Sequence, residues 1–233
     1  MSSAEAGARS SPAPRPAQTR LRAMLSRHPS VTVAGMLLGN AWWRIRLARG
    51  QRDTYMGATH AQLSLDESIR YIENVFDDYK RYGEIGHFEG NVAEIGPGDC
   101  AGVALLCRAD GCEHVDLIDR YASYRDPARL ARIYQALAAR HDLARFQMGA
   151  GWDDRALRGI DWHIGRSAEE FFGRQTPENR APYDYIISRC VLEYLQGDTL
   201  ATLTALARAL RPGGKMVHKI DLRDDGWFSS SGH

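Results

Sequence analysis

The chain has 233 residues, with 30 Lys and Arg side chains against 29 Asp and Glu, so its formal net charge is +1. An apolar fraction of 44% and a charged fraction of 25% are typical of one globular domain, which excludes fibrous, fully disordered and multi-span membrane proteins. The near-neutral total hides an asymmetry: residues 1–50 carry eight arginines and one acid, a charge of +7, whereas the remainder has 22 basic and 28 acidic side chains, a charge of −6.

The basic N-terminal region is predicted to be a tail followed by an arm. Residues 1–19 are rich in Ser, Ala, Pro and Arg and are expected to be disordered. Residues 20–63 are expected to form a basic, partly helical arm with one or two short helices. The uncharged stretch 31–43 has 13 residues, whereas a membrane span needs about 20. A peripheral membrane contact, an organellar transit peptide and a solvated tail all fit this composition.

The cysteine pattern favours an intracellular protein. The four cysteines form no Cys-x-x-Cys pair and have no His pair at zinc-finger spacing, so we expect no metal site. At this density they are interpreted as reduced thiols, which predicts a cytoplasmic location.

From residue 64 onward the sequence predicts a single α/β domain. A lead-in helix over 64–82 begins at a capping box, Ser64 with Glu67, and carries one apolar stripe. After Gly90, strands and helices alternate, which favours a mostly parallel sheet with helices on both faces. The expected strands are 91–95, 114–119, 160–164, 183–188 and 215–222, and the expected helices are 101–109, one from Asp126-Pro127, one through Phe171 and one capped by Asp198.

The most informative motif follows the first strand of this domain. Gly96-Pro97-Gly98 allows a tight turn and a close approach of the backbone to a ligand. The spacing to Gly102 is one residue longer than in the nicotinamide dinucleotide fingerprint. An acid, Asp119, ends the next strand, where a carboxylate can accept both hydroxyls of a ribose.

These motifs resemble those of the class I S-adenosylmethionine-dependent methyltransferases. The resemblance runs from about residue 90 to residue 222, with the first motif, the ribose-binding acid, the adenine-contacting segment, the fourth-strand motif and the turn before the fifth strand in order. It implies a Rossmann-like, doubly wound fold and S-adenosylmethionine as cofactor. The cofactor-binding residues that it implies are Glu94, Gly96, Pro97, Gly98, Gly102, Asp119, Arg120, Ser167, Ala168, Glu169, Ser188 and Arg189.

The expected reaction is direct displacement of the methyl group onto a small-molecule, glycan or lipid-type acceptor. Glu193 and Tyr194 are the candidate catalytic residues, and Tyr194 stands where many family members have His. The weakly acidic domain argues against broad nucleic-acid binding, which needs a basic face, so no nucleic-acid partner is expected. A nicotinamide-dependent oxidoreductase on a similar fold and a non-catalytic module that binds a cofactor or a partner remain the alternatives.

The segment after the fifth predicted strand departs from the family pattern. Family members usually close the sheet with an antiparallel hairpin, and here 11 residues follow Leu222. We therefore expect a sheet without that hairpin, in which the fifth strand is an edge. Truncation of the chain, a second copy in a homo-oligomer and coverage by the N-terminal segment are the alternatives that would explain this edge.

Overall fold

The computed structural model describes residues 28–50, 53–54, 57–148, 151–153, 156–173, 182–195 and 197–222. The chain forms two compact units: residues 1–51 with 222–233, and residues 52–221. The larger unit thus begins at Arg52, whereas the sequence suggested a boundary at Ser64. The predicted disordered tail, 1–19, lies outside the described residues.

In the described part of the smaller unit, residues 28–50, the structure has helix α2 (Pro29–Ala48), which at 20 residues is longer than the short helices expected. Pro29 is its first residue, a position where the missing N–H of proline costs nothing. Its first turn holds no acid, Arg46 lies in its last turn, and Leu37 and Trp42 are exposed. No described helix is both long enough and apolar enough to span a membrane.

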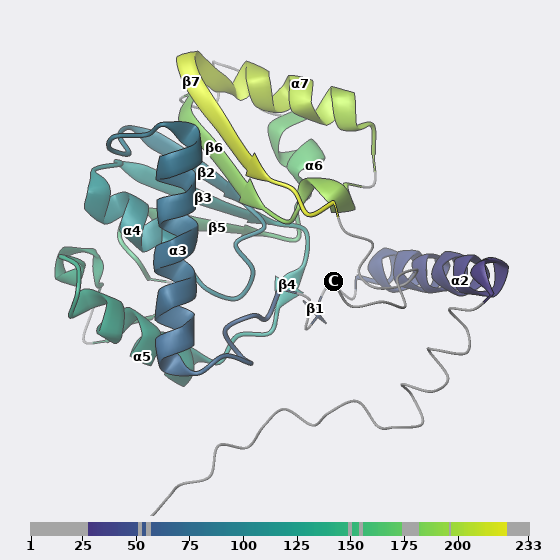
Figure 1. Cartoon of the computed structure of the whole chain (residues 1–233), viewed down its shortest axis with the longest axis horizontal. Coiled ribbons are helices and arrows are strands. Elements are labelled where there is room, and N and C mark those ends of the chain that lie inside the picture. Colours follow the sequence, from purple (N-terminus) through teal and green to yellow (C-terminus); the bar gives the residue numbers. More distant parts are fainter. Residues whose placement is uncertain are drawn as a thin grey trace, which may run out of the picture. The chain divides into compact units, whose positions relative to one another are not determined.

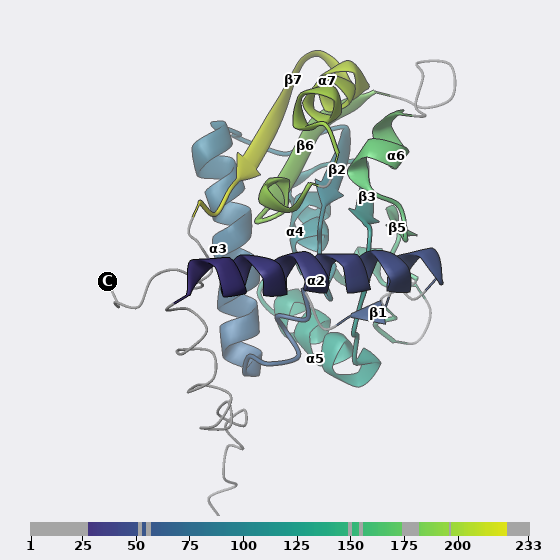
Figure 2. The same cartoon turned by 90° about the vertical axis from the view of Figure 1, so that its right-hand side faces the viewer.

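The larger unit is built on a five-stranded sheet in the order β5-β3-β2-β6-β7, with every neighbouring pair parallel (Figure 1). The strands are β2 (Asn91–Ile95), β3 (His114–Asp119), β5 (Ile160–Ile164), β6 (Tyr183–Arg189) and β7 (Leu210–Lys219). Helices cover both faces of this sheet, so the predicted Rossmann-like, doubly wound class is confirmed (Figure 2).

The two faces bury separate apolar clusters because successive residues of each strand point to opposite sides. Val92 packs in the cluster that includes residues of three helices, and Ala93 packs in the cluster on the other side. The first face is covered by α3 (Leu65–Gly83), α4 (Gly102–Asp110) and α5 (Pro127–Ala138), and the second by α6 (Ala168–Gly173) and α7 (Thr199–Ala209).

Side-chain caps fix where the helices begin, as the sequence predicted. The Ser64 hydroxyl accepts from the Glu67 N–H, and the Glu67 carboxylate accepts from the Ser64 N–H at 2.8 Å, which completes the capping box of α3. Asp126 and Asp198 cap α5 and α7 by accepting two backbone N–H groups each.

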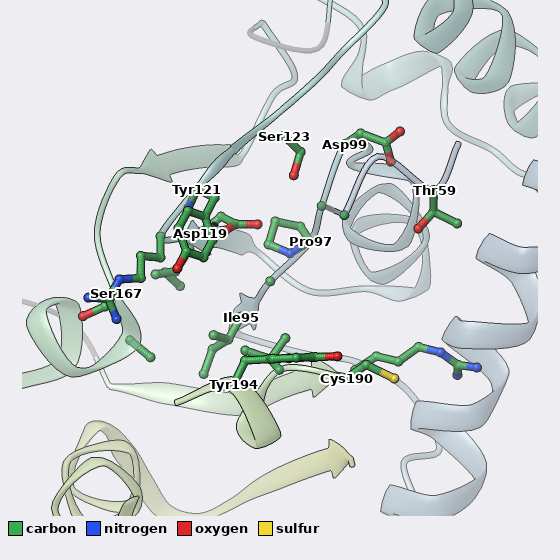
Figure 3. A pocket seen from close by; sticks show the side chains of 18 of the residues that line it. Thr59, Ile95, Pro97, Asp99, Asp119, Tyr121, Ser123, Ser167, Cys190 and Tyr194 are labelled. Atoms are coloured by element: carbon green, nitrogen blue, oxygen red, sulfur yellow. Dashed lines mark hydrogen bonds between the residues drawn. The ribbon is translucent and has the colours of Figure 1, made fainter. Parts of the chain in front are cut away.

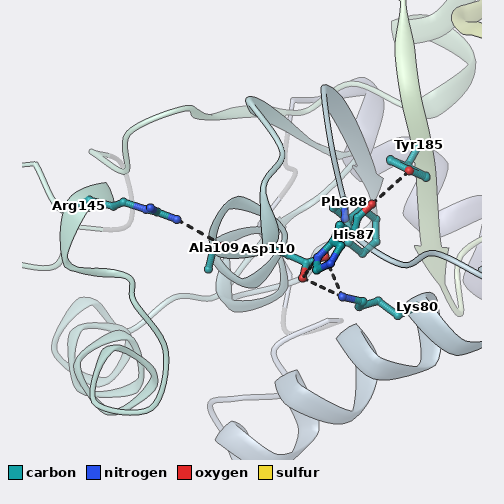
Figure 4. Close-up of polar contacts among 7 residues, drawn as sticks. All are labelled: Lys80, His87, Phe88, Ala109, Asp110, Arg145 and Tyr185. Carbon is teal, nitrogen blue, oxygen red and sulfur yellow. Dashed lines mark hydrogen bonds and ion pairs between the residues drawn. The ribbon is translucent and has the colours of Figure 1, made fainter.

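Asp110, at the end of α4, joins the lead-in helix to the sheet (Figure 4). Its carboxylate accepts from Lys80 Nζ of α3 at 2.8 Å and from the Phe88 N–H at 2.7 Å. The hydroxyl of Tyr185 in β6 donates to the carbonyl of His87 in the same segment. These contacts hold α3 and the start of β2 in one place, which also fixes the side chains that α3 presents to the site.

The last strand differs from its prediction. Residues 211–214 were expected to be a turn before a strand over 215–222, but β7 begins at Leu210 and ends at Lys219. Leu210 already pairs with Tyr183, and the pairing resumes at Lys215 after a register shift. The glycine-rich segment is therefore absorbed as an irregularity within the strand, with Gly213 at φ +84°. In the described sheet β7 is an outer strand.

Several short elements were not predicted. β1 (Asp53–Thr54) pairs in parallel with β4 (Ala122–Ser123), which ties the segment before α3 to the segment after β3. Between 141 and 159 the sequence shows no clear periodicity; there the chain forms a 3₁₀ turn, η1 (Ala144–Phe146), and an antiparallel bridge from Gln147 to Leu157. Elements this short carry no periodicity that a sequence could reveal.

Candidate functional site

A cavity of about 440 Å³ opens at the carboxyl ends of β2, β3 and β6 (Figure 3). In an open parallel sheet this is the edge where ligands bind, at the strand from which the chain winds in both directions. Most of the predicted site residues line it: Gly96, Pro97, Gly98, Asp119, Arg120, Ser167, Ala168, Glu169, Arg189 and Tyr194.

The turn after β2 requires its two glycines. Gly96 and Gly98 have φ values of +72° and +69°, which side-chain-bearing residues rarely adopt. A Cβ at Gly96 would collide with Val191, and a Cβ at Gly98 would lie 2.5 Å from the carbonyl oxygen of Gly57. The turn therefore presents bare backbone to the cavity.

Asp119, at the end of β3, is held in place by backbone donors. Its Oδ1 accepts from the Tyr121 N–H at 2.9 Å, and the Gly98 N–H also donates to the carboxylate. Burial raises the pKa of Asp119, and the two N–H groups oppose that rise. A carboxylate has more acceptor positions than these two bonds use, so Asp119 can still accept from hydroxyls of a ligand.

Ser167, at the start of α6, both lines the cavity and caps the helix. Its hydroxyl accepts from the Glu170 N–H at 3.2 Å, while the Glu170 carboxylate accepts from the Ser167 N–H. Figure 3 shows Ser167 on the same side of Pro97 as Asp119 and Tyr121. The cap orients this segment toward the end of the cavity where Asp119 lies.

The opposite end of the cavity is formed where β6 meets α3. Arg189 donates to the Asp78 carboxylate of α3 at 2.9 Å, and its guanidinium lies 5.5 Å from the ring centroid of Tyr71. The next residue, Cys190, has a φ of +53°, a strained value for a residue other than glycine. This backbone turn carries the chain away from the sheet and leaves Cys190 in the cavity wall.

A loop that precedes α3, residues 57–61, forms another part of the wall; we name it the cover loop. The Asp99 carboxylate accepts from the N–H groups of His60 and Ala61, and the Asp99 N–H donates to the carbonyl of Gly57 at 3.1 Å. Arg129 of α5 donates to the carbonyl of His60. Sequence reasoning favoured an ordinary loop position for His60 over one that lines a substrate lid, because the contacts of the cover loop join residues about forty positions apart and no local motif indicates them.

Two residues predicted to bind the cofactor lie away from the cavity lining, on or near the face covered by α3. Glu94 is buried in β2 on the same side as Val92, and burial raises its pKa to about 8. A Cβ at Gly102 would lie 2.6 Å from Ile72 Cδ1, so this glycine allows α4 to approach α3. The structure thus gives Gly102 a packing role in place of the predicted ligand contact.

Two further predicted residues are also placed outside the lining. Ser188 is buried, and its hydroxyl lies 2.8 Å from Nδ1 of His218. Glu193, a candidate catalytic residue, accepts from the Asp221 N–H at 3.2 Å through Oε1. Of the two candidate catalytic side chains, the structure places only the exposed Tyr194 in the cavity wall.

A His and Asp cluster lies elsewhere, on β3 and β5. Ligand-type atoms of His114, Asp116 and Asp161 fall within 4.8 Å of one another. The central carboxylate, Asp116, is buried and accepts from the Tyr183 hydroxyl at 2.7 Å, and its other oxygen lies 2.6 Å from His163 Nε2. These hydrogen bonds already satisfy the buried carboxylate, so the cluster is explained as a polar network inside the fold.

Comparison with known proteins adds two findings. Residues 65–231, more than half of the chain, match the family model described as a methyltransferase domain. The chain is also similar to one in the solved complex between the Haloferax volcanii Trm112 methyltransferase activator and a protein assigned as a methyltransferase, with 16% identity and a TM-score of 0.38. That alignment covers 69% of this chain and 57% of the other, so this chain spans less than two thirds of that neighbour's length. No curated protein matches the sequence.

Proposed function

The chain belongs to the methyltransferase domain family, and on this premise we propose that it transfers the methyl group of S-adenosylmethionine to a small-molecule, glycan or lipid-type acceptor. The observation that carries the proposal is the position of Asp119. Its carboxylate is fixed by two backbone N–H groups at the end of β3, in a cavity floored by the Gly96–Gly98 turn. A carboxylate at this place in a doubly wound sheet suits the two hydroxyls of a ribose.

The other lining residues fit the remaining parts of this cofactor. The left-handed glycines allow the ligand to approach the backbone closely. Arg120, Ser167, Ala168 and Glu169 lie in the wall near Asp119 and are proposed to hold the adenine. When bound, the sulfonium supplies an activated methyl group, so the chain itself has to orient the acceptor and exclude water. No covalent nucleophile is required for a direct displacement.

The acceptor is proposed to meet the wall formed by Val191, Tyr194 and Leu195, which follows β6. This part of the wall is mainly apolar and aromatic, which supports a small organic or lipid-type acceptor more than a nucleic acid. Tyr194 is the proposed contact for the acceptor's reacting group. Two partner predictions also stay proposals: a peripheral membrane contact through the basic N-terminal arm, and a second copy of the chain paired along β7.

Isothermal titration calorimetry of the full chain with S-adenosylmethionine and, separately, with NAD tests the proposal. We expect a one-to-one complex with S-adenosylmethionine and no heat of binding with NAD. Binding of NAD alone would overturn the proposal in favour of a nicotinamide-dependent enzyme. Binding of neither compound would also refute the proposal, because it would mean that this family member does not bind the cofactor.

A further inference from the structure

His60, in the cover loop, is a buried side chain with an unused polar atom. Its side chain lines the cavity although the residue is only 5% exposed. Among the residues that the structure describes, its Nδ1 has no hydrogen-bond partner. Native structures rarely bury a ring nitrogen without a partner, and such an atom in a cavity wall points to a ligand that supplies the missing partner.

The imidazole is fixed in this position from several sides. The Asp99 carboxylate accepts from the backbone N–H of His60, and Arg129 donates to its carbonyl. The ring packs edge-on against Tyr71 of α3, with centroids 5.5 Å apart. A ring held in this way cannot easily turn toward solvent to satisfy Nδ1, so the group is arranged for a ligand before it binds.

The surroundings of His60 favour a negatively charged partner. Burial, and secondarily the charge of Arg129, lowers the pKa of His60 to about 4, so the imidazole is neutral at pH 7 and keeps one N–H to donate. Arg189 lies in the same wall, with its guanidinium against the Tyr71 ring. The neighbouring acid Asp99 already accepts from the His60 and Ala61 N–H groups. A carboxylate suits a site with one neutral donor and two nearby guanidinium groups.

We propose that His60 binds the amino-acid end of the cofactor, with its imidazole Nδ1–H donating to the carboxylate. The inference rests on the proposed function. Thr59, the neighbour of His60, lies on the other side of Pro97 from Asp119 and Ser167 (Figure 3). A ligand whose ribose is held at Asp119 and whose body crosses the glycine turn therefore places its far end near the cover loop.

The test compares two ligands that differ only in that carboxylate, S-adenosylmethionine and decarboxylated S-adenosylmethionine, by calorimetry on the full chain. His60→Phe keeps an aromatic ring against Tyr71 and removes both nitrogens. It is expected to weaken the binding of S-adenosylmethionine at least about tenfold, as expected for a lost hydrogen bond to a charged group, and the binding of the decarboxylated compound less than about twofold. His60→Asn, which keeps a short donor, is expected to retain more affinity for S-adenosylmethionine than His60→Phe.

His218→Phe is the matched control. His218 is also a buried imidazole whose pKa is lowered to about 4 by burial and whose Nε2 has no partner within the described part of the chain, but it does not line the cavity. Its loss should leave both affinities unchanged, and thermal unfolding of each variant checks that the fold persists. Unchanged affinity in His60→Phe, or an equal loss for both ligands, would overturn the proposal. Failure of the wild-type chain to bind S-adenosylmethionine would instead refute the proposed function.

Discussion

Replacing Glu94 by Gln should reduce the loss of folding stability that accompanies a rise in pH. Glu94 is buried in β2, and within the described residues its Oε2 has no hydrogen-bond partner. Burial raises its pKa in the folded protein from 4.5 to about 8. Because the folded-state pKa is the higher one, the unfolded chain releases this proton first, and the free energy of unfolding falls as the pH rises from about 4.5 to about 8.

The size of this effect follows from the two pKa values. Each pKa unit corresponds to about 1.4 kcal/mol, so ionisation of Glu94 should remove about 3 kcal/mol of stability between pH 5 and pH 8. Gln has a similar shape and does not ionise, so Glu94→Gln should lack this loss. Urea unfolding of both proteins at pH 5, 6.5 and 8 measures it, with Glu113→Gln, an exposed acid, as the control. Parallel pH profiles for the wild type and Glu94→Gln would show that Glu94 is not a buried carboxyl of raised pKa.

Two further substitutions test the site and the fold. Gly98→Ala should cost about 1–3 kcal/mol of stability and weaken S-adenosylmethionine binding, because alanine disfavours φ +69° and its Cβ would meet the Gly57 carbonyl. The control in thermal unfolding and calorimetry is Gly86→Ala, whose added Cβ enters open space. Equal results for the two variants would contradict the reasoning. Tyr183→Phe should cost about 1–3 kcal/mol because it removes a donor from buried Asp116. The Tyr185 hydroxyl makes only a 3.4 Å hydrogen bond, so Tyr185→Phe should lower the free energy of unfolding less than Tyr183→Phe does, as measured by urea unfolding. A larger loss for Tyr185→Phe would refute this account of the network.

The sequence predicted the parts of the fold that are set by local patterns. The strand over Asn91–Ile95 and the capping box at Ser64 appear in the structure where periodicity and capping chemistry placed them. The start of β7 could not be predicted, because it depends on the pairing of Leu210 with Tyr183 across the sheet. A turn signal such as Pro-Gly-Gly does not say whether the strand resumes its pairing on both sides.

In the candidate site, too, local patterns predicted some residues, and long-range contacts place the others. Asp119 ends a buried strand at a spacing from the glycine turn that is visible in the sequence, and the structure places it in the cavity wall. Glu94 and Gly102 belong to the first motif, but both face α3. This could not be predicted, because the spacing of a motif does not say which face of a strand or helix meets the ligand. The cover loop and His60 could not be assigned to the site, since only the long-range bonds of Asp99 place them there.

Calorimetric titration of Asp119→Ala with S-adenosylmethionine tests the central claim most directly. The substitution removes the carboxylate proposed to hold the ribose, and Asp161→Ala, which removes an exposed acid on the neighbouring strand, is the control. The account predicts that Asp119→Ala weakens binding at least about tenfold while Asp161→Ala binds as the wild type does. Wild-type affinity in Asp119→Ala would contradict it.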